Sequence, residues 1–315
     1  MRILFMGTPD FASSILDKIC ENNSDTVIGV LTQPDKPRGR GHSLAESAVK
    51  VLAKEKNIPV YQPDTLKDNA FLPTLKKLDP ELIIVAAYGK ILPSYVLDYP
   101  KLGCINVHGS LLPKYRGAAP IQRAIIDGES ITGITIMKMA EGLDTGDMLL
   151  KNSVDITNED NFETLHDKMV VCARKSIAEA IELIREGKDV YEKQDDSLAN
   201  YAQKITKEDC LIDFNTDAIS LHNRIRGLSP FPLAYSYLDS KMIKFTSSVV
   251  IEENKDNAPD TVGRIVGTDD GVIAVACQKG VIGITGVLPE GKKRMSAADF
   301  IRGQQNIAGK SFCAQ

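Results

Sequence analysis

The chain has 315 residues, of which 43% are hydrophobic and 25% are charged, and its formal net charge is −4. This length suits two globular domains rather than one, and the slightly acidic balance excludes a uniformly basic, nucleic-acid-binding surface. The sequence has no run of 18 apolar residues and no N-terminal segment resembling a signal peptide. We therefore expect a cytoplasmic protein that does not enter a membrane.

Strand-like and helix-like segments alternate through the first half of the chain. The predicted strands are 2–6, 26–32, a short one near Val60, 82–87, 103–107 and 131–139, and the predicted helices are 10–22, 45–53, 68–78, 119–127 and 160–186. Because the strands are nearly continuous apolar runs, this alternation predicts a Rossmann-like, doubly wound parallel sheet with helices on both faces. We expect this α/β domain to span residues 1–189.

The second half of the chain has a different pattern. Residues 190–205 are polar and lack apolar periodicity, so we expect a linker there. Helices are predicted at 219–226 and 296–304, and short β-like runs at 234–238, 242–250, 262–268, 271–277 and 280–287. Runs of this length separated by glycine-containing turns predict a smaller antiparallel β-barrel, OB-like in kind, over residues 206–315.

The stretch 103–147 gathers the most potential chemistry. Asn106 and His108 end an apolar strand, and residues two apart in a strand point to the same side. Asp144 follows about 36 residues later in the loop EGLDTGD. Ligands of open α/β sheets bind beyond the carboxyl ends of the strands, so we expect both loops to leave the same end of the parallel sheet.

These three side chains could act together, although each also has a structural interpretation. An amide and an imidazole can hydrogen-bond an oxygen that becomes negative, and histidine can move a proton near neutral pH. Asp144 could orient the imidazole of His108. Taken singly, the histidine could be a hydrogen-bonded structural residue, and the aspartate could simply occupy a turn.

Other motifs are weaker. The first βα turn lacks GxGxxG, which disfavours a dinucleotide cofactor, and the absence of GxSxG makes Ser110 an improbable covalent nucleophile. Arg38 and Arg40 in the glycine-rich loop PRGRG could be solvated charges or a phosphate-contacting arm. A second basic cluster lies at 292–294. The six cysteines form no CxxC pair, so we expect neither a metal site nor a disulfide framework.

With these motifs described, the chain resembles the folate-dependent formyltransferase family along essentially its whole length. The resemblance is carried by FMGTPDFA at 5–12, TQPDKPRGRG at 32–41, AAYGKILP at 86–93, INVHGSLLPKYRGAAPIQRAI at 105–125, GLDTGD at 142–147, KITKEDCLIDF at 204–214, NRIRGLSPFPLAY at 223–235 and GKKRMSAADFIRG at 291–303. The NVHGSLLP element and the D-x-G loop are common to formyltransferases with different acceptors, so they indicate the reaction and the formyl donor. The PRGRG loop and the C-terminal motifs are more specific to the acceptor.

The resemblance implies a donor, an acceptor and a set of residues. The donor is 10-formyltetrahydrofolate, the acceptor is the α-amino group of methionyl initiator tRNA, and no metal is required. The implied catalytic residues are Asn106, His108 and Asp144, and the implied donor-site residues are Ser110, Leu111, Leu112 and Pro113. Arg38 and Arg40 would bind the acceptor arm of the tRNA, and the barrel would add a further tRNA surface. The family also implies a monomer that serves translation initiation.

Three alternatives stay open at this point. One is a formyltransferase acting on a small amine, such as an aminosugar nucleotide or glycinamide ribonucleotide. Another is a formyltetrahydrofolate hydrolase, in which water replaces the amine, and a third is a non-catalytic RNA-binding protein. The PRGRG loop and the barrel domain argue against the small-amine enzyme, and a hydrolase would not need the PRGRG loop. The Asn-His-Asp set argues against the non-catalytic protein.

Overall fold

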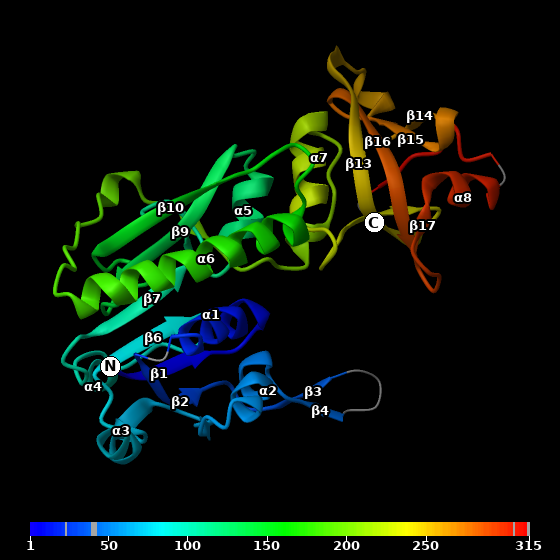
Figure 1. Cartoon of the computed structure of the whole chain (residues 1–315). Helices are drawn as coiled ribbons and strands as arrows, with labels where there is room; N and C mark the ends of the chain where they lie inside the picture. Colours follow the sequence, from blue (N-terminus) through cyan, green and yellow to red (C-terminus); the bar gives the residue numbers. More distant parts are fainter. Residues whose placement is uncertain (23, 39–42, 305, 314–315) are drawn as a thin grey trace. The chain divides into compact units, whose positions relative to one another are not determined.

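The computed structural model describes residues 1–22, 24–38, 43–304 and 306–313, and they form two compact units (Figure 1). The first unit comprises 1–117, 132–154 and 167–201, and the second comprises 118–131, 155–166 and 202–315. Both units are therefore assembled from separate stretches of chain. The predicted domains, 1–189 and 206–315, are continuous stretches. In the structure, the internal segments 118–131 and 155–166 belong to the second unit instead of the first.

The first unit is built on a seven-stranded sheet in the order β10-β9-β7-β6-β1-β2-β5. Its strands are β1 (Arg2–Gly7), β2 (Thr26–Leu31), β5 (Val60–Tyr61), β6 (Leu82–Ala86), β7 (Cys104–His108), β9 (Ile131–Lys138) and β10 (Met148–Asp155). The neighbours from β5 to β7 are parallel, whereas β9 runs antiparallel to β7. Strand β10 was not predicted, because this edge strand, MLLKNSVD, has only a short apolar start and is mostly polar afterwards.

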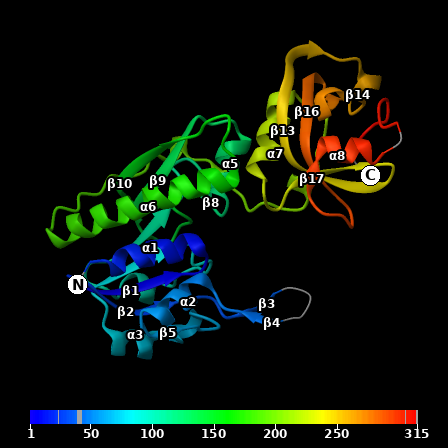
Figure 2. The same ribbon diagram turned by 45° about the vertical axis from the view of Figure 1, so that its right-hand side comes forward.

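Helices cover both faces of this sheet. The helices are α1 (Asp10–Cys20), α2 (Ala48–Glu55), α3 (Leu72–Leu78), α4 (Ser94–Leu97) and α6 (Phe162–Arg185). Ile83 and Val85 of β6 pack with residues of α3 and α4 on one face of the sheet. In the neighbouring strand β1, Ile3 and Phe5 point to the opposite face, where they are fully buried. Figures 1 and 2 both show α1 and α6 side by side, and Arg174 of α6 donates to the Ser14 carbonyl of α1 at 2.6 Å.

A short pair of strands overlaps the predicted glycine-rich loop PRGRG. Strand β3 (Lys36–Arg38) pairs antiparallel with β4 (Ser43–Ala45). Two further short strands, β8 (Arg116–Gly117) and β11 (Tyr201–Ala202), pair with each other, and the single-turn 3₁₀ helices are η1 (Lys67–Asn69), η2 (Asp196–Leu198), η3 (Glu208–Cys210), η4 (Pro259–Thr261) and η5 (Asp269–Gly271).

The second unit contains an antiparallel sheet in the order β12-β13-β16-β15-β14, with β17 beside β16. Its elements are α5 (Pro120–Ile126), α7 (Ala218–Gly227), β12 (Ala234–Leu238), β13 (Lys241–Asp256), β14 (Ile265–Gly267), β15 (Ile273–Ala276), β16 (Lys279–Pro289), β17 (Met295–Ser296) and α8 (Ala297–Arg302). The last residues join the two edges of the sheet: Cys313 exchanges backbone hydrogen bonds with Tyr237 of β12, and the Lys310 carbonyl accepts from Ile265 of β14. The edge strands thus have partners, as in a barrel.

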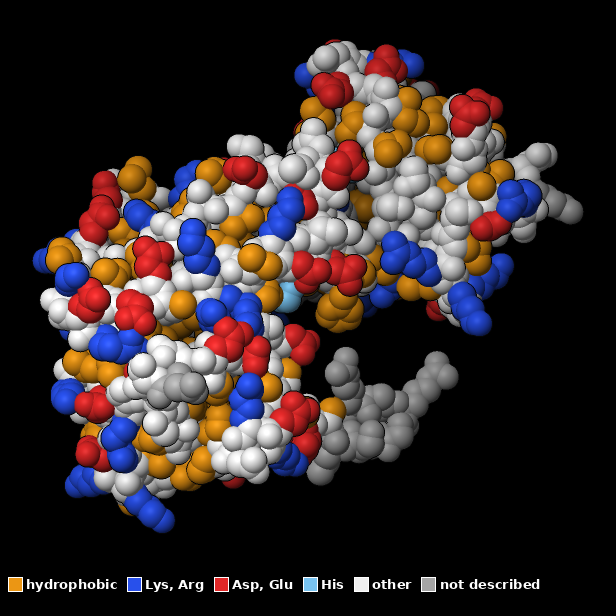
Figure 3. All heavy atoms as spheres, viewed as in Figure 1, with side chains coloured by type: hydrophobic (Ala, Val, Ile, Leu, Met, Phe, Trp, Pro, Cys, Tyr) orange, Lys and Arg blue, Asp and Glu red, His pale blue; other side chains and the backbone are white. Residues whose placement is uncertain are grey.

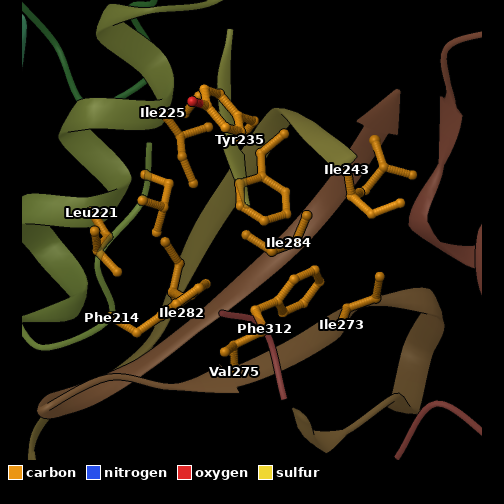
Figure 4. Packing of buried hydrophobic residues seen from close by; sticks show 14 of the residues in the cluster. Phe214, Leu221, Ile225, Tyr235, Ile243, Ile273, Val275, Ile282, Ile284 and Phe312 are labelled. Carbon is orange, nitrogen blue, oxygen red and sulfur yellow. The ribbon is translucent and has the colours of Figure 1, made fainter. Parts of the chain in front are cut away.

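A single hydrophobic cluster fills the interior of this barrel. Figure 4 shows Phe214, Tyr235, Ile284 and Phe312 converging between the sheet and α7. The Phe312 ring lies edge-on to Phe245, with ring centroids 5.3 Å apart, a favourable aromatic geometry. The predicted fold class, a Rossmann-like sheet followed by a smaller barrel, is confirmed.

Helices α5 and α7 pack closely within the second unit. A Cβ on Gly227 of α7 would lie 2.8 Å from Cγ1 of Ile126, so only glycine fits at this crossing. The neighbouring Arg226 is buried and donates to the carbonyls of Thr157 and Asp160 at 3.0 and 2.9 Å. These contacts hold the segments 118–131 and 155–166 to the C-terminal part of the chain.

Candidate active site

The imidazole of His108 is buried at the end of β7; one of its nitrogens is hydrogen-bonded and the other faces a carboxylate. Its Nε2 lies 2.9 Å from the carbonyl oxygen of Tyr115. Because a carbonyl oxygen only accepts, Nε2 carries the hydrogen and donates it. Nδ1 then faces Oδ2 of Asp144 at 3.6 Å, so the second nitrogen is the one that can exchange a proton beside a carboxylate.

Asp144 reaches this histidine by a different route from the predicted one. The expectation that both loops leave the same end of a parallel sheet is wrong, because β9 is antiparallel and its last residue, Lys138, pairs with Ile105 at the start of β7. The loop after β9 must therefore run back along β7 toward His108. Asp144 has a φ of 52° there, and its Oδ2 accepts the backbone N–H of Gly117 at 2.8 Å.

Asn106 lies two residues before His108 and so points to the same side of β7. It is half-buried, and its backbone pairs with Val85 and Met137 in the sheet. Within the described part of the chain, no hydrogen-bond partner is found for its side-chain amide. The amide is therefore available as a donor beside a buried imidazole, which fits the binding of an oxygen that becomes negative.

The predicted donor-site residues differ in exposure. Leu112 is buried with Met137 and Met148, and the hydroxyl of Ser110 donates to the Lys114 carbonyl at 2.6 Å. Their side chains thus shape the loop from inside. The remaining two, Leu111 and Pro113, are half-exposed and can contact a ligand directly. Thr135 of β9 ties the loop to the sheet, since its hydroxyl donates to the Ser110 carbonyl at 2.7 Å.

The predicted tRNA-binding arginines lie at the edge of what the structure describes. Arg38 ends β3, and only its backbone is described, while Arg40 lies outside the described residues. The basic residues Lys292, Lys293 and Arg294 are exposed in the second unit. On the face of the first unit shown in Figure 3, acidic and basic side chains are interspersed.

The Tyr88 hydroxyl and the Cys104 thiol are buried, and burial disfavours the ionised form of both. Burial raises the pKa of Tyr88 to about 12, and its hydroxyl stays protonated inside the core beside α3. Burial also raises the pKa of the Cys104 thiol in β7, which disfavours the thiolate. In residues 1–22, 24–38, 43–304 and 306–313, no group of three His, Cys, Asp or Glu side chains could hold a metal ion.

Two residues that the sequence patterns did not indicate, Gln194 and Arg116, make hydrogen bonds that connect to the loop that carries Asp144. Gln194 donates to the carbonyls of Asp144 and Gly146 at 2.8 and 2.7 Å. Arg116, which is buried, donates in turn to the side-chain oxygen of Gln194. Arg116 stands inside the motif KYRGAAP and could have been singled out, but Gln194 lies in a polar stretch with no distinguishing signal.

Comparison with known proteins defines the class to which this fold and site belong. The formyl transferase family matches residues 1–181, and the formyl transferase C-terminal domain matches residues 204–305. The protein is therefore a formyl-transferring enzyme, and the predicted enzyme class is confirmed.

Full-length relatives narrow the class further. A methionyl-tRNA formyltransferase of Geotalea daltonii is 45% identical over 98% of this chain and 97% of its own length. Another, of Caldanaerobacter subterraneus subsp. tengcongensis, is 47% identical over 96% and 97%. The chain belongs to the methionyl-tRNA formyltransferase family.

Solved structures share the fold at low sequence identity. The methionyl-tRNA formyltransferase of Clostridium thermocellum matches 79% of this chain and 93% of its own, with a TM-score of 0.53 and 21% identity. An N-formyltransferase of Helicobacter canadensis in complex with folinic acid and dTDP-3-aminofucose matches 90% and 98%, with a TM-score of 0.68 and 18% identity. HypX of Aquifex aeolicus in complex with tetrahydrofolic acid matches 99% and 51%, with a TM-score of 0.62 and 17% identity.

Proposed function

We propose that the protein transfers the formyl group of 10-formyltetrahydrofolate to the α-amino group of methionyl initiator tRNA, for translation initiation. The observation that carries this proposal is the His108–Asp144 pair, in which the imidazole is buried. The Asn106 amide, which has no partner among the described residues, lies on the same side of the strand. The chain also matches methionyl-tRNA formyltransferases over both halves. The reaction forms a bond between the formyl carbon and the amine nitrogen. It breaks the bond between that carbon and the donor nitrogen, and one proton moves from the amine to the donor nitrogen.

The site residues divide this chemistry among themselves. The amide of Asn106 donates to the formyl oxygen as its negative charge develops, an interaction typically worth about 3 kcal/mol of barrier. The Nε2–H of His108 is held by the Tyr115 carbonyl, which leaves Nδ1 to take and return the proton. Asp144 stabilises the imidazolium form from 3.6 Å. None of these steps needs a covalent serine.

The remaining predicted residues either contact a substrate or stabilise the loop that does. Leu111 and Pro113 contact the folate donor, and Ser110 and Leu112 keep their loop in place from the interior. Arg38 and Arg40 bind phosphates of the tRNA acceptor arm, because arginine pairs bidentately with phosphate. The protein acts as a cytoplasmic monomer. Within the described residues, no helix is both long enough and apolar enough to span a membrane.

A formyl-transfer assay tests the acceptor. The protein is incubated with 10-formyltetrahydrofolate and either methionyl initiator tRNA, free methionine or an aminosugar nucleotide, and formylated products are quantified. We expect formyl on the charged tRNA only. Formyl on the small amines alone would establish the small-amine alternative, and release of formate without any acceptor would establish the hydrolase.

A further inference from the structure

Residues 190–201, which we call the return segment, lie against both loops of the candidate site within the first unit. At one end, Glu192 and Met148 exchange backbone hydrogen bonds of 2.8 and 2.9 Å directly after the Asp144 loop. At the other end, the carbonyl of Asn200 accepts from the backbone of Arg116 at 3.0 Å. A stretch with the composition of a linker thus connects the loop that carries Asp144 to the loop that follows His108.

Gln194 stands at the centre of this connection and uses both halves of its amide. Its Nε2 donates to the carbonyls of Asp144 and Gly146, so it bonds the backbone on either side of Thr145. Its Oε1 accepts from Nε and Nη2 of Arg116 at 3.0 and 2.8 Å. All of the hydrogen-bonding atoms of a half-buried amide are therefore directed at the two site loops.

Arg116 fixes the direction of that amide. Its side chain is 3% exposed, and a buried guanidinium needs acceptors for its donors. The guanidinium also bonds Oδ1 of Asp196 at 2.6 Å, and the Asp196 side chain is 82% exposed. Because a guanidinium only donates, it requires the oxygen of Gln194 to face it, and the NH₂ group must then face the Asp144 loop.

We infer that Gln194, oriented by Arg116, is a positioning residue that holds the Asp144 loop so that its carboxylate faces His108. This inference rests on the proposed function, since it assigns a role to Asp144 in formyl transfer. Asp144 has a left-handed backbone, with φ at 52°, and comes from the far end of an antiparallel strand. Such a loop needs external bonds to keep its position.

The test variant is Gln194→Glu, which keeps an acceptor for Arg116 and removes the NH₂ donor. We expect kcat for formyl transfer to fall by about 10- to 100-fold with little change in KM for either substrate, because a misplaced catalytic group affects the chemical step. The matched control is Asp196→Ala, which removes the exposed partner of the same arginine. That variant should keep wild-type kcat, because Gln194 still accepts from the guanidinium and water can replace a carboxylate that is 82% exposed.

A double-mutant cycle separates positioning from general destabilisation. If Gln194 acts through Asp144, Gln194→Glu should lower kcat in the wild-type background and have no further effect in an Asp144→Ala background. Wild-type kcat in Gln194→Glu, or an equal loss in both backgrounds, would overturn the inference. If that variant does not fold, the same cycle is run with Gln194→Ala, and the same two outcomes decide. A wild-type protein that transfers no formyl group would instead refute the proposed function.

Discussion

At the scale of single residues, the orientation of His108 determines which atom can act. The Tyr115 carbonyl takes the Nε2 hydrogen at 2.9 Å, so the proton-exchanging nitrogen is the one that faces Asp144. The proposed donor to the formyl oxygen is the amide of Asn106, which points to the same side of β7 as His108. The chemistry therefore depends on three side chains whose backbone positions are fixed by one strand and one returning loop.

Replacement of Asn106 by alanine should lower kcat by about 100-fold or more, because the formyl oxygen loses a donor as its charge develops. The unfolding temperature should stay close to that of the wild type, since no bond to another described residue is lost. Steady-state formyl transfer and circular dichroism check these two results. Full activity in this variant would exclude the amide from the mechanism.

The loop glycines provide a second test at this scale. A Cβ on Gly146 would lie 1.7 Å from the carbonyl oxygen of Lys138, so Gly146→Ala must displace the backbone that carries Asp144. We expect a loss in kcat on the order of 100-fold, as for a catalytic group moved by about 1 Å. The control is Gly142→Ala in the same loop, whose Cβ would meet only the movable side chain of Thr145. Equal activities of the two variants would argue against this steric explanation.

At the scale of elements, the second unit depends on helix α7. Gly227 allows α5 to approach, and Arg226 binds the segment before α6. On another side, His222 of α7 has its Nδ1 3.0 Å from the hydroxyl of Ser248 in β13. The helix therefore links the barrel to the two internal segments that join this unit.

Gly227→Ala should destabilise the second unit by about 1–3 kcal/mol, because the added methyl overlaps Ile126. Gly303→Ala is a suitable control, since its Cβ would make only ordinary contacts at 3.6 Å. Hydrogen exchange of the α7 amides measures the effect in each variant. Unchanged protection in Gly227→Ala would show that the helices can separate without cost.

The buried imidazole of His222 should contribute to the pH dependence of stability. Burial, with a further contribution from the charge of Arg226, lowers its pKa below the ordinary value of 6.5. The folded state then binds fewer protons than the unfolded state, so this contribution to stability is present above pH 6.5 and is lost as the pH falls below it. We expect His222→Gln to show a smaller drop in unfolding temperature than the wild type between about pH 7.5 and about pH 5.5. An equal drop in both proteins would contradict this assignment.

At the scale of the whole molecule, the chain crosses between its units several times. Residues 118–131 and 155–166 belong to the second unit although the first unit continues until residue 201. An isolated C-terminal fragment, residues 202–315, would lack the surface that covers one side of α7. The stretches that form the two units therefore interleave along the chain, even though each unit has its own sheet and core.

We expect this fragment to lose the amide protection of α7 while it keeps that of β13 and β16. The barrel strands bond to one another, whereas α7 also needs Ile126 and the carbonyls of Thr157 and Asp160. Hydrogen exchange on the fragment and on the full chain provides the comparison. Equal protection of α7 in both would show that the predicted limit at residue 206 marks an independently stable domain.

Much of this architecture could be predicted because it depends on local patterns. Apolar runs indicate the parallel strands, and turn-separated short runs indicate the barrel. The motifs around Asn106–His108 and around Asp144 are short local stretches, so their resemblance to formyltransferases indicates the reaction. Strand β10 was missed because most of this edge strand is polar and its apolar run is too short to indicate a buried strand, and Arg40 lies outside the described residues.

Local patterns in the sequence therefore predict the element types and the order of the two domains, and the resemblance of its motifs to formyltransferases implies the reaction. Three features became visible only in the folded chain: β9 runs antiparallel to β7, the Asp144 loop returns along β7, and Gln194 bonds that loop. These features depend on pairing between residues 27 to 50 positions apart. Such pairing is selected by packing and hydrogen bonding in the folded chain, and no local pattern encodes it.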